Sequence, residues 1–61
     1  MIDLQKERIN KGLTQEQLAE KVGVVRQTIS EIECGRKKPS VQLAIKLGKV
    51  LKIKWTNFFE K

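Results

Sequence analysis

One stretch of this sequence decides the fold: residues 15–34, which read QEQLAEKVGVVRQTISEIEC. Ala19 is small, as the closest approach of two crossing helices requires, and Gly23 follows four residues later. Glycine permits the left-handed backbone that ends one helix sharply and lets the next begin within about three residues. The other core positions of the pattern are apolar: Leu18, Val22, Val24, Ile29 and Ile32. Most intervening positions are polar, so the stretch predicts two helices that cross steeply through a tight turn.

The residues before this turn also predict helices. Glycine and proline are sparse along the whole chain, and apolar residues recur at helical spacing. A first helix is expected over residues 2–11, with Leu4 and Ile9 facing inward. A second helix is expected to open at Thr14, whose hydroxyl can cap it, and Gln17 three residues later would complete a capping box.

Helices are predicted after the turn as well, so the whole chain reads as all-α. The third helix should span about residues 25–34. Ser40 can cap a fourth helix. The inward face of that helix is expected to carry four residues at helical spacing: Ala44, Leu47, Gly48 and Leu51. A last short helix over about residues 55–60 would close the core with Phe58.

Length and composition exclude several classes of protein. A chain of 61 residues buries only about 60% of its unfolded surface, so we expect a single domain over residues 1–61. The lone Cys34 can form no internal disulfide and is expected to be an inert thiol rather than a redox switch. No leader and no long apolar run occur, which predicts a cytoplasmic protein. Without histidine, tyrosine or metal-ligand spacing, we expect no enzyme, no metal and no cofactor.

The chain is strongly basic. It carries 13 Lys and Arg against 7 Asp and Glu, which leaves a net charge of +6. Such a charge attracts polyanions, including nucleic acids. Many small basic proteins simply have solvated lysine faces, so charge alone does not decide between the two interpretations.

Arg8 is out of place in the apolar pattern of the first helix. It lies one turn beyond Leu4, on the side expected to pack against the core. An unpaired guanidinium on that side would be costly. We therefore expect Arg8 to have an acidic partner.

The sequence resembles the Cro/CI or Xre-type repressor domains over nearly its whole length. The matching residues are Arg8, the run GLTQEQLA at 12–19, Gly23, Val24, the run RQTIS at 26–30, Ile32, Glu33, Gly35, Pro39, Ser40 and Leu51. The resemblance implies a lambda-repressor-like five-helix bundle with a central helix-turn-helix over about residues 15–34. In that family the third helix enters the major groove of operator DNA, and two copies usually read a palindrome. The expected partners are therefore double-stranded DNA and a second copy of the chain, in the role of a transcriptional repressor.

By position, the resemblance assigns base contacts to the third helix. Arg26, Gln27 and Glu31 would read bases, and Thr28 would touch bases or the sugar-phosphate backbone. The chemistry agrees, because Arg pairs bidentately with guanine, Gln with adenine, and Glu accepts from cytosine. Arg26 also places a cation in the first turn of a helix, which the helix dipole disfavours. The alternative is that these side chains form only the solvated face of an amphipathic helix.

The resemblance also implies contacts to the DNA backbone. Gln15, at the start of the second helix, matches the family's phosphate contact. The basic loop of Arg36, Lys37 and Lys38 would add affinity that does not depend on sequence. The alternatives are an ordinary exposed glutamine and a solvated basic loop.

Two further positions follow from the comparison with the family pattern. Arg8 and Glu33 match a structural ion pair rather than a DNA contact, which would account for the charge on the inner face. Val25 stands where the family usually has a capping Ser or Thr. Its methyl groups could meet a thymine methyl, or it could be a valine tolerated beside the core.

Dimerisation is expected because so small a domain makes few base contacts. Ile53, Trp55 and Phe59 are the candidate interface residues, with Trp55 preferred and core closure as the alternative for each. A rival function is an antitoxin-like protein-interaction module that binds DNA only for autoregulation. Single-strand or RNA binding is less favoured, because the aromatic residues lie away from the basic loop. No small-molecule ligand is expected.

Overall fold

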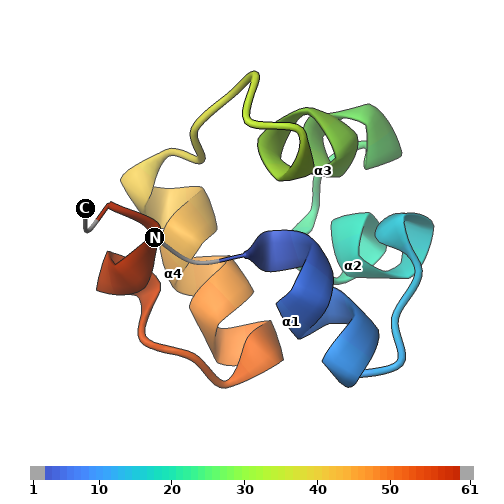
Figure 1. The fold of residues 1–61 in the computed structure, drawn as a ribbon, viewed down its shortest axis with the longest axis horizontal. Coiled ribbons are helices and arrows are strands. Elements are labelled where there is room, and N and C mark those ends of the chain that lie inside the picture. The colour runs from blue at the N-terminus through green and yellow to red at the C-terminus, as the bar shows by residue number, and fades with distance from the viewer. Residues whose placement is uncertain (1–2, 60–61) are drawn as a thin grey trace.

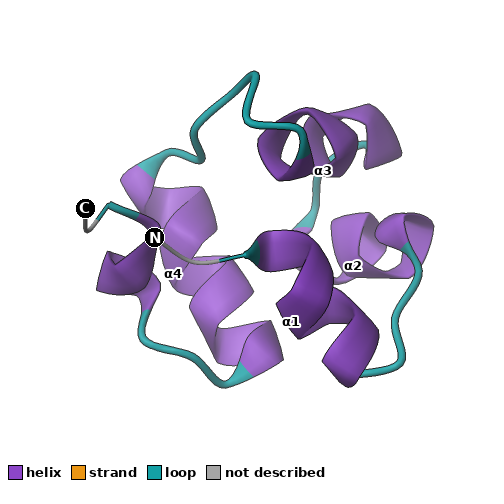
Figure 2. Ribbon diagram, in the orientation of Figure 1, coloured by secondary structure: helices purple, strands orange, loops and turns teal. Residues whose placement is uncertain are grey.

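This computed structural model describes residues 3–59. Within that range the chain forms four α-helices and one short 3-10 helix. The helices are α1 (Leu4–Asn10), α2 (Gln15–Val22), α3 (Arg26–Glu33), α4 (Val41–Leu51) and the 3-10 helix η1 (Trp55–Phe58). Residues 3–59 contain no strand, and loops join the helices (Figures 1 and 2). The all-helical class predicted from the sequence is confirmed.

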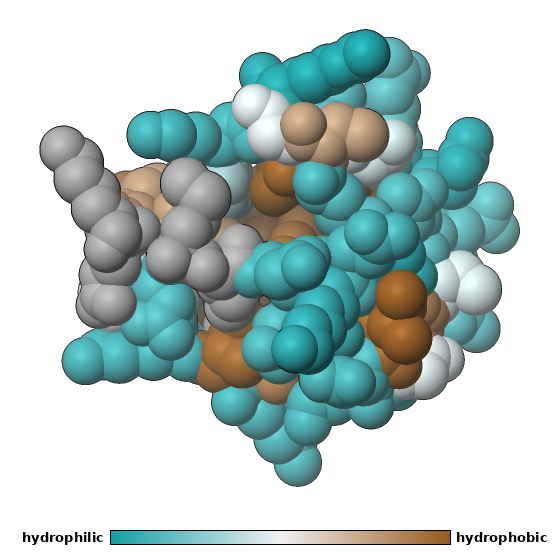
Figure 3. Space-filling model, in the orientation of Figure 1, coloured by the Kyte–Doolittle hydropathy of each residue, from teal (hydrophilic) through white to brown (hydrophobic). Residues whose placement is uncertain are grey.

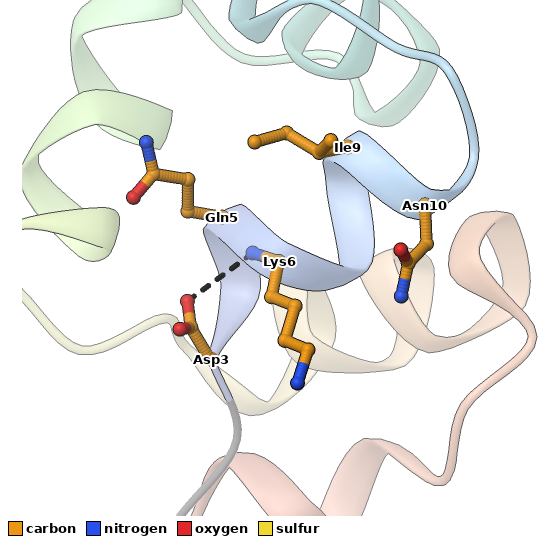
Figure 4. A pocket seen from close by; sticks show the side chains of 5 residues that line it. All are labelled: Asp3, Gln5, Lys6, Ile9 and Asn10. Atoms are coloured by element: carbon orange, nitrogen blue, oxygen red, sulfur yellow. Dashed lines mark hydrogen bonds between the residues drawn. The ribbon is translucent and has the colours of Figure 1, made fainter.

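Side-chain caps set where the helices begin. The Thr14 side chain accepts from the Gln17 N–H at 3.0 Å, and the Thr14 N–H donates to the Gln17 side chain at 2.9 Å, which completes the predicted capping box. Ser40 caps α4 as predicted. Asp3 caps α1 by accepting from the Lys6 N–H at 3.2 Å (Figure 4). This cap was not predicted. It starts α1 at Leu4, whereas the sequence predicted a start at residue 2, which lies outside the described residues.

The core lies where α2, α3 and α4 meet, and α1 and η1 cover it. Its largest fully buried side chains are Leu18, Ile29, Leu47 and Leu51. Phe58, the residue predicted to close the core, is 7% exposed and belongs to this cluster. In the view of Figure 3 most of the molecular surface is hydrophilic, and hydrophobic side chains appear in separate patches.

The inward orientation predicted for Ile9 is wrong, because its side chain is 58% exposed. The buried residues of α1 are Leu4 and Arg8, which are four positions apart and share one face. Each residue turns an α-helix by about 100°, so Ile9 points away from that face. It lines a shallow surface pocket with Gln5 and Lys6 (Figure 4).

The fifth α-helix predicted near the C-terminus is a 3-10 helix of four residues instead. Lys54 provides no side-chain cap, and Thr56 and Asn57 are weak helix formers, so the segment forms a single tight turn. Residue 60, the predicted end of this helix, lies outside the described residues.

Gly48 allows η1 to pack closely on α4. A Cβ atom added there would lie 2.8 Å from the Ile53 carbonyl oxygen and 3.1 Å from the Trp55 Cβ. The chain reverses between α4 and η1 at Lys52, whose φ of 57° is the only positive value at a non-glycine residue within the described range. Gly48 was predicted to lie on the inward face of α4, and these contacts explain why that position has no side chain.

Candidate nucleic-acid interface

The helix-turn-helix is built as the sequence pattern requires. Gly23 has a φ of 77° and ends α2 in the left-handed conformation. The Val24 N–H then donates to the Ala19 carbonyl at 2.9 Å, which closes the turn. Ala19 is 2% exposed and Ile29 fully buried, so the two helices leave no space for a larger side chain at position 19. The turn therefore holds α3 rigidly against α2.

The candidate base-reading residues lie on α3, and two of them, Gln27 and Glu31, lie on the side that turns away from Ile29. Arg26 and Gln27, in the first helical turn, are exposed, whereas Thr28 and Glu31 are half-buried. Gln27 and Glu31 are four positions apart and so share one face of the helix. The four residues are therefore spread around α3, and Arg26 and Gln27 in its first turn are the most accessible of them.

Arg8 and Glu33 form a buried ion pair that joins α1 to the end of α3. Arg8 Nε donates to Glu33 Oε2 at 2.7 Å, and the two side chains are only 11% and 5% exposed. Arg8 Nη2 donates to Glu33 Oε1 at 3.4 Å, and Nη1 donates to the Leu13 carbonyl at 2.7 Å. The expected acidic partner is therefore present, and the guanidinium is satisfied on three sides.

Gln15 extends this ion pair toward the exposed surface. Its side-chain Nε2 donates to Glu33 Oε1 at 3.0 Å, and its Oε1 accepts from Arg26 Nη1 across 3.4 Å. A chain of side chains thus runs from Arg8 through Glu33 and Gln15 to Arg26. The amide nitrogen has two N–H groups, so one is left for an external acceptor such as phosphate. Neither contact was predicted; the signal in the sequence was that Gln15 and Arg26 both begin helices of one helix-turn-helix.

The contact with Gln15 also bears on the unfavourable position of Arg26. A cation in the first turn of α3 faces the positive end of the helix dipole. The Gln15 side-chain oxygen Oε1 accepts from the exposed Arg26 guanidinium at 3.4 Å and offsets part of that cost. Arg26 is therefore held at the surface by a polar group.

The basic loop between α3 and α4 lies beside the helix-turn-helix. Figure 1 shows it rising past the end of α3 before α4 begins. Arg36, Lys37 and Lys38 are all exposed. Lys37 and Lys38 line a surface groove together with Thr28 and with Lys46 of α4, whereas Arg36 does not. Lys46 was not singled out in the sequence, because only the fold brings α4 next to the loop.

The candidate dimer residues lie in or next to η1, which packs on α4 (Figure 1). Ile53 and Trp55 are half-buried and pack against the core. Phe59 is 43% exposed, and its ring meets that of Trp55 edge to face with centroids 6.2 Å apart. Of the three, Phe59 has the largest exposed fraction.

Other kinds of site have little support in residues 3–59. That range holds no group of three or more His, Cys, Asp or Glu residues that could bind a metal ion. Cys34 is an exposed free thiol at the end of α3. None of the described helices is both long and apolar enough to cross a membrane.

The chain belongs to the helix-turn-helix family, whose model matches residues 4–58. It is similar to YqaF of Bacillus subtilis, an uncharacterized HTH-type transcriptional regulator, with 44% identity over 93% of this chain and 75% of that protein. An uncharacterized HTH-type transcriptional regulator of Methanothermobacter thermautotrophicus is 58% identical over 66% of this chain and 58% of its own length. The predicted resemblance to Cro/CI-type regulators is thereby confirmed.

Solved structures give the same assignment. The N-terminal DNA-binding domain of SinR from Bacillus subtilis superposes with a TM-score of 0.83 at 30% identity, over 95% of this chain and 86% of that domain. The SinR chain in a SinR–SinI protein complex superposes equally well, and this chain spans 57% of it. The chain thus corresponds in extent to a DNA-binding domain and to part of some longer relatives.

Proposed function

We propose that this chain is a sequence-specific binder of double-stranded DNA that regulates transcription, in the simplest case as a repressor. The observation that carries the proposal is the exposed first turn of α3. There Arg26 and Gln27 project from a helix held by a rigid turn, with Arg26 oriented by Gln15. Side chains that read bases must be held in this way on a rigid element.

Four polar residues of α3 have proposed roles in DNA recognition. Arg26 pairs with guanine and Gln27 with adenine, and Glu31 accepts from cytosine. Thr28 is half-buried next to the lysine groove, a position that suits a contact to bases or to the sugar-phosphate backbone. One good bidentate pair provides about 1–3 kcal/mol of discrimination between bases.

Contacts to the DNA backbone are proposed on both sides of α3. Gln15 would offer its second amide N–H to a phosphate at the start of α2. On the other side Lys37, Lys38 and Lys46 share a groove that also reaches Thr28, so a phosphate strand passing there meets several cations. Arg36 does not line that groove and would add to DNA affinity only through the overall positive charge of the domain.

A homodimer on a palindromic operator is proposed from the position of the C-terminal apolar residues. Phe59, whose ring meets Trp55, leaves an exposed apolar side chain outside α3 that a second copy could cover. The proposal includes one folding unit over residues 1–61 and action in the cytoplasm. It requires no catalysis and no cofactor.

A second candidate is a protein-interaction module of the antitoxin kind, which would bind DNA only for autoregulation. It is favoured by one observation: a similar solved chain, SinR, is in a complex with another protein, SinI. In this chain the same exposed Phe59 surface would then receive a different protein rather than a second copy.

The experiment that separates the two candidates is selection from a randomised DNA library at two salt concentrations, with sequencing of the bound fraction. A DNA-reading dimer is expected to recover a palindromic motif and to lose affinity steeply as salt rises. Binding without an enriched motif would contradict sequence-specific reading and favour the protein-interaction module.

A further inference from the structure

Val25 has no structural role that accounts for its side chain. It is 68% exposed, the highest value among the large apolar residues exposed within residues 3–59. It does not belong to the core cluster or to the partly buried residues packed against it. Val25 therefore does not pack beside the core, and a valine that is merely tolerated at the surface stays the alternative to a contact with DNA.

The backbone at Val25 takes part in the start of α3 although its side chain is mostly exposed. Val25 is the N-cap of α3, with φ −81° and ψ 155°, and it makes no side-chain capping bond. Its carbonyl oxygen accepts from the Thr28 N–H at 3.0 Å. A serine or threonine at this position would cap the helix, so the valine leaves the helix without a cap that Thr14 and Ser40 provide elsewhere.

The neighbours of Val25 suggest what its methyl groups would meet. Arg26 and Gln27 follow directly, and under the proposed function they lie in the major groove. The C5 methyl of thymine is the apolar group that base edges display in that groove. A valine side chain is stiff about χ1 and loses little freedom when it makes such a contact.

We infer that Val25 is a specificity-determining residue that contacts a thymine 5-methyl group next to the base pairs read by Arg26 and Gln27. This inference rests on the proposed function and adds to it an apolar contact. It assigns recognition of a T·A pair in each half-site to the N-cap of α3. A C·G pair presents no methyl group in the same place.

The test replaces each thymine of the selected DNA site, one at a time, by deoxyuridine. This change removes only the 5-methyl group and keeps every hydrogen-bonding group. Wild-type protein is expected to lose about fourfold in affinity at one thymine position per half-site, the value of one buried methyl-sized group. Replacement in both half-sites should multiply the two losses, to about sixteenfold.

Two variants show whether Val25 makes the contact. In Val25→Ala and Val25→Ser the deoxyuridine effect should disappear at that position and stay unchanged elsewhere. Val25→Ser restores a capping oxygen, so its melting temperature should not fall and unfolding cannot explain the result. Val41→Ser, at an exposed valine of α4, is the matched control and should keep the wild-type deoxyuridine effect.

The outcomes distinguish this inference from the function on which it rests. Wild-type binding that is insensitive to deoxyuridine at every thymine, or a deoxyuridine effect that persists in Val25→Ala, would overturn the inference and leave DNA binding intact. Failure to bind any DNA sequence would overturn both.

Discussion

The Gln15 side chain donates to the Glu33 carboxylate across 3.0 Å and so joins the first residue of α2 to the last residue of α3. Glu33 is held in turn by Arg8 in a nearly buried ion pair. Because Gln15 also contacts Arg26, the packing of α1 is connected to the direction of an exposed guanidinium at the start of α3. The packing of α1 and the proposed reading residue Arg26 are therefore connected by one set of polar contacts.

Arg8→Ala is predicted to destabilise the domain without removing any DNA contact. The substitution leaves the buried Glu33 carboxylate with only Gln15 as a donor, which should cost about 3 kcal/mol of unfolding free energy. Urea denaturation followed by circular dichroism measures this loss, with the exposed Arg36→Ala as the matched control. An Arg8→Ala protein that melts like wild type yet fails to bind DNA would contradict the structural assignment.

Gln15→Ala is predicted to affect both stability and base preference. Loss of the hydrogen bond to the Glu33 carboxylate should cost about 1–3 kcal/mol of stability. Arg26 would lose its acceptor, so discrimination at the guanine it reads should weaken. The measurement is binding to sites mutated one base pair at a time, with the exposed Gln5→Ala as control. If only the salt dependence changes, Gln15 is a phosphate contact and does not position Arg26.

Gly48→Ala is predicted to lower stability, although alanine is the better helix former by about 1 kcal/mol. The new methyl group would lie 2.8 Å from the Ile53 carbonyl oxygen, a backbone atom, so η1 must move away from α4. Overpacking of this kind costs about 1–3 kcal/mol. Thermal melting tests the prediction, and Lys49→Ala on the exposed side of α4 is the control. A higher melting temperature for Gly48→Ala would show that η1 adapts freely.

Replacing Lys37 and Lys38 together by alanine is predicted to weaken binding to all sequences alike. Each lost phosphate contact should reduce the slope of log K against log salt by about 0.9. A double variant of the exposed Lys49 and Lys54 has the same net charge and should keep the slope. Equal slopes in the two double variants would mean that the groove does not follow the DNA backbone.

Phe59→Ser is predicted to weaken self-association while sparing the fold, because the ring is 43% exposed. If Phe59 is central to the interface, the dimer dissociation constant should rise by about tenfold or more. Sedimentation at micromolar concentration measures it, with Val41→Ser as an exposed apolar control. An unchanged association state would show that Phe59 is not part of the interface. Trp55→Ala, at the residue preferred from the sequence, then tests whether the half-buried Trp55 belongs to it.

Features that depend on local sequence were predictable. Thr14 and Ser40 carry their caps next to the helices they begin, and Gly23 supplies its own backbone conformation. The acidic partner of Arg8 followed from a charge on a packed face together with the family pattern. The caps and the turn need only the spacing of a helix, and the cost of burying an unpaired charge indicates that Arg8 has a partner. The identity of that distant partner, Glu33, came from the family pattern alone.

Features that depend on how distant segments meet were not predictable. Ile9 was misplaced because α1 has seven residues, too few for the apolar spacing to define one face. The contact between Gln15 and Arg26 needs the relative placement of two helix starts. The close approach at Gly48 and the position of Lys46 beside the basic loop likewise exist only after α4 has packed.

The most direct test of the central claim is the base preference of Gln27→Ala, determined by library selection beside wild type and the control Gln5→Ala. If the first turn of α3 reads bases, Gln27→Ala should lose discrimination by about 1–3 kcal/mol at one base pair in each half-site and keep the wild-type preference elsewhere. Gln5→Ala should reproduce the wild-type motif. A Gln27→Ala motif identical to that of wild type at every position would contradict the claim that α3 reads the operator through its exposed first turn.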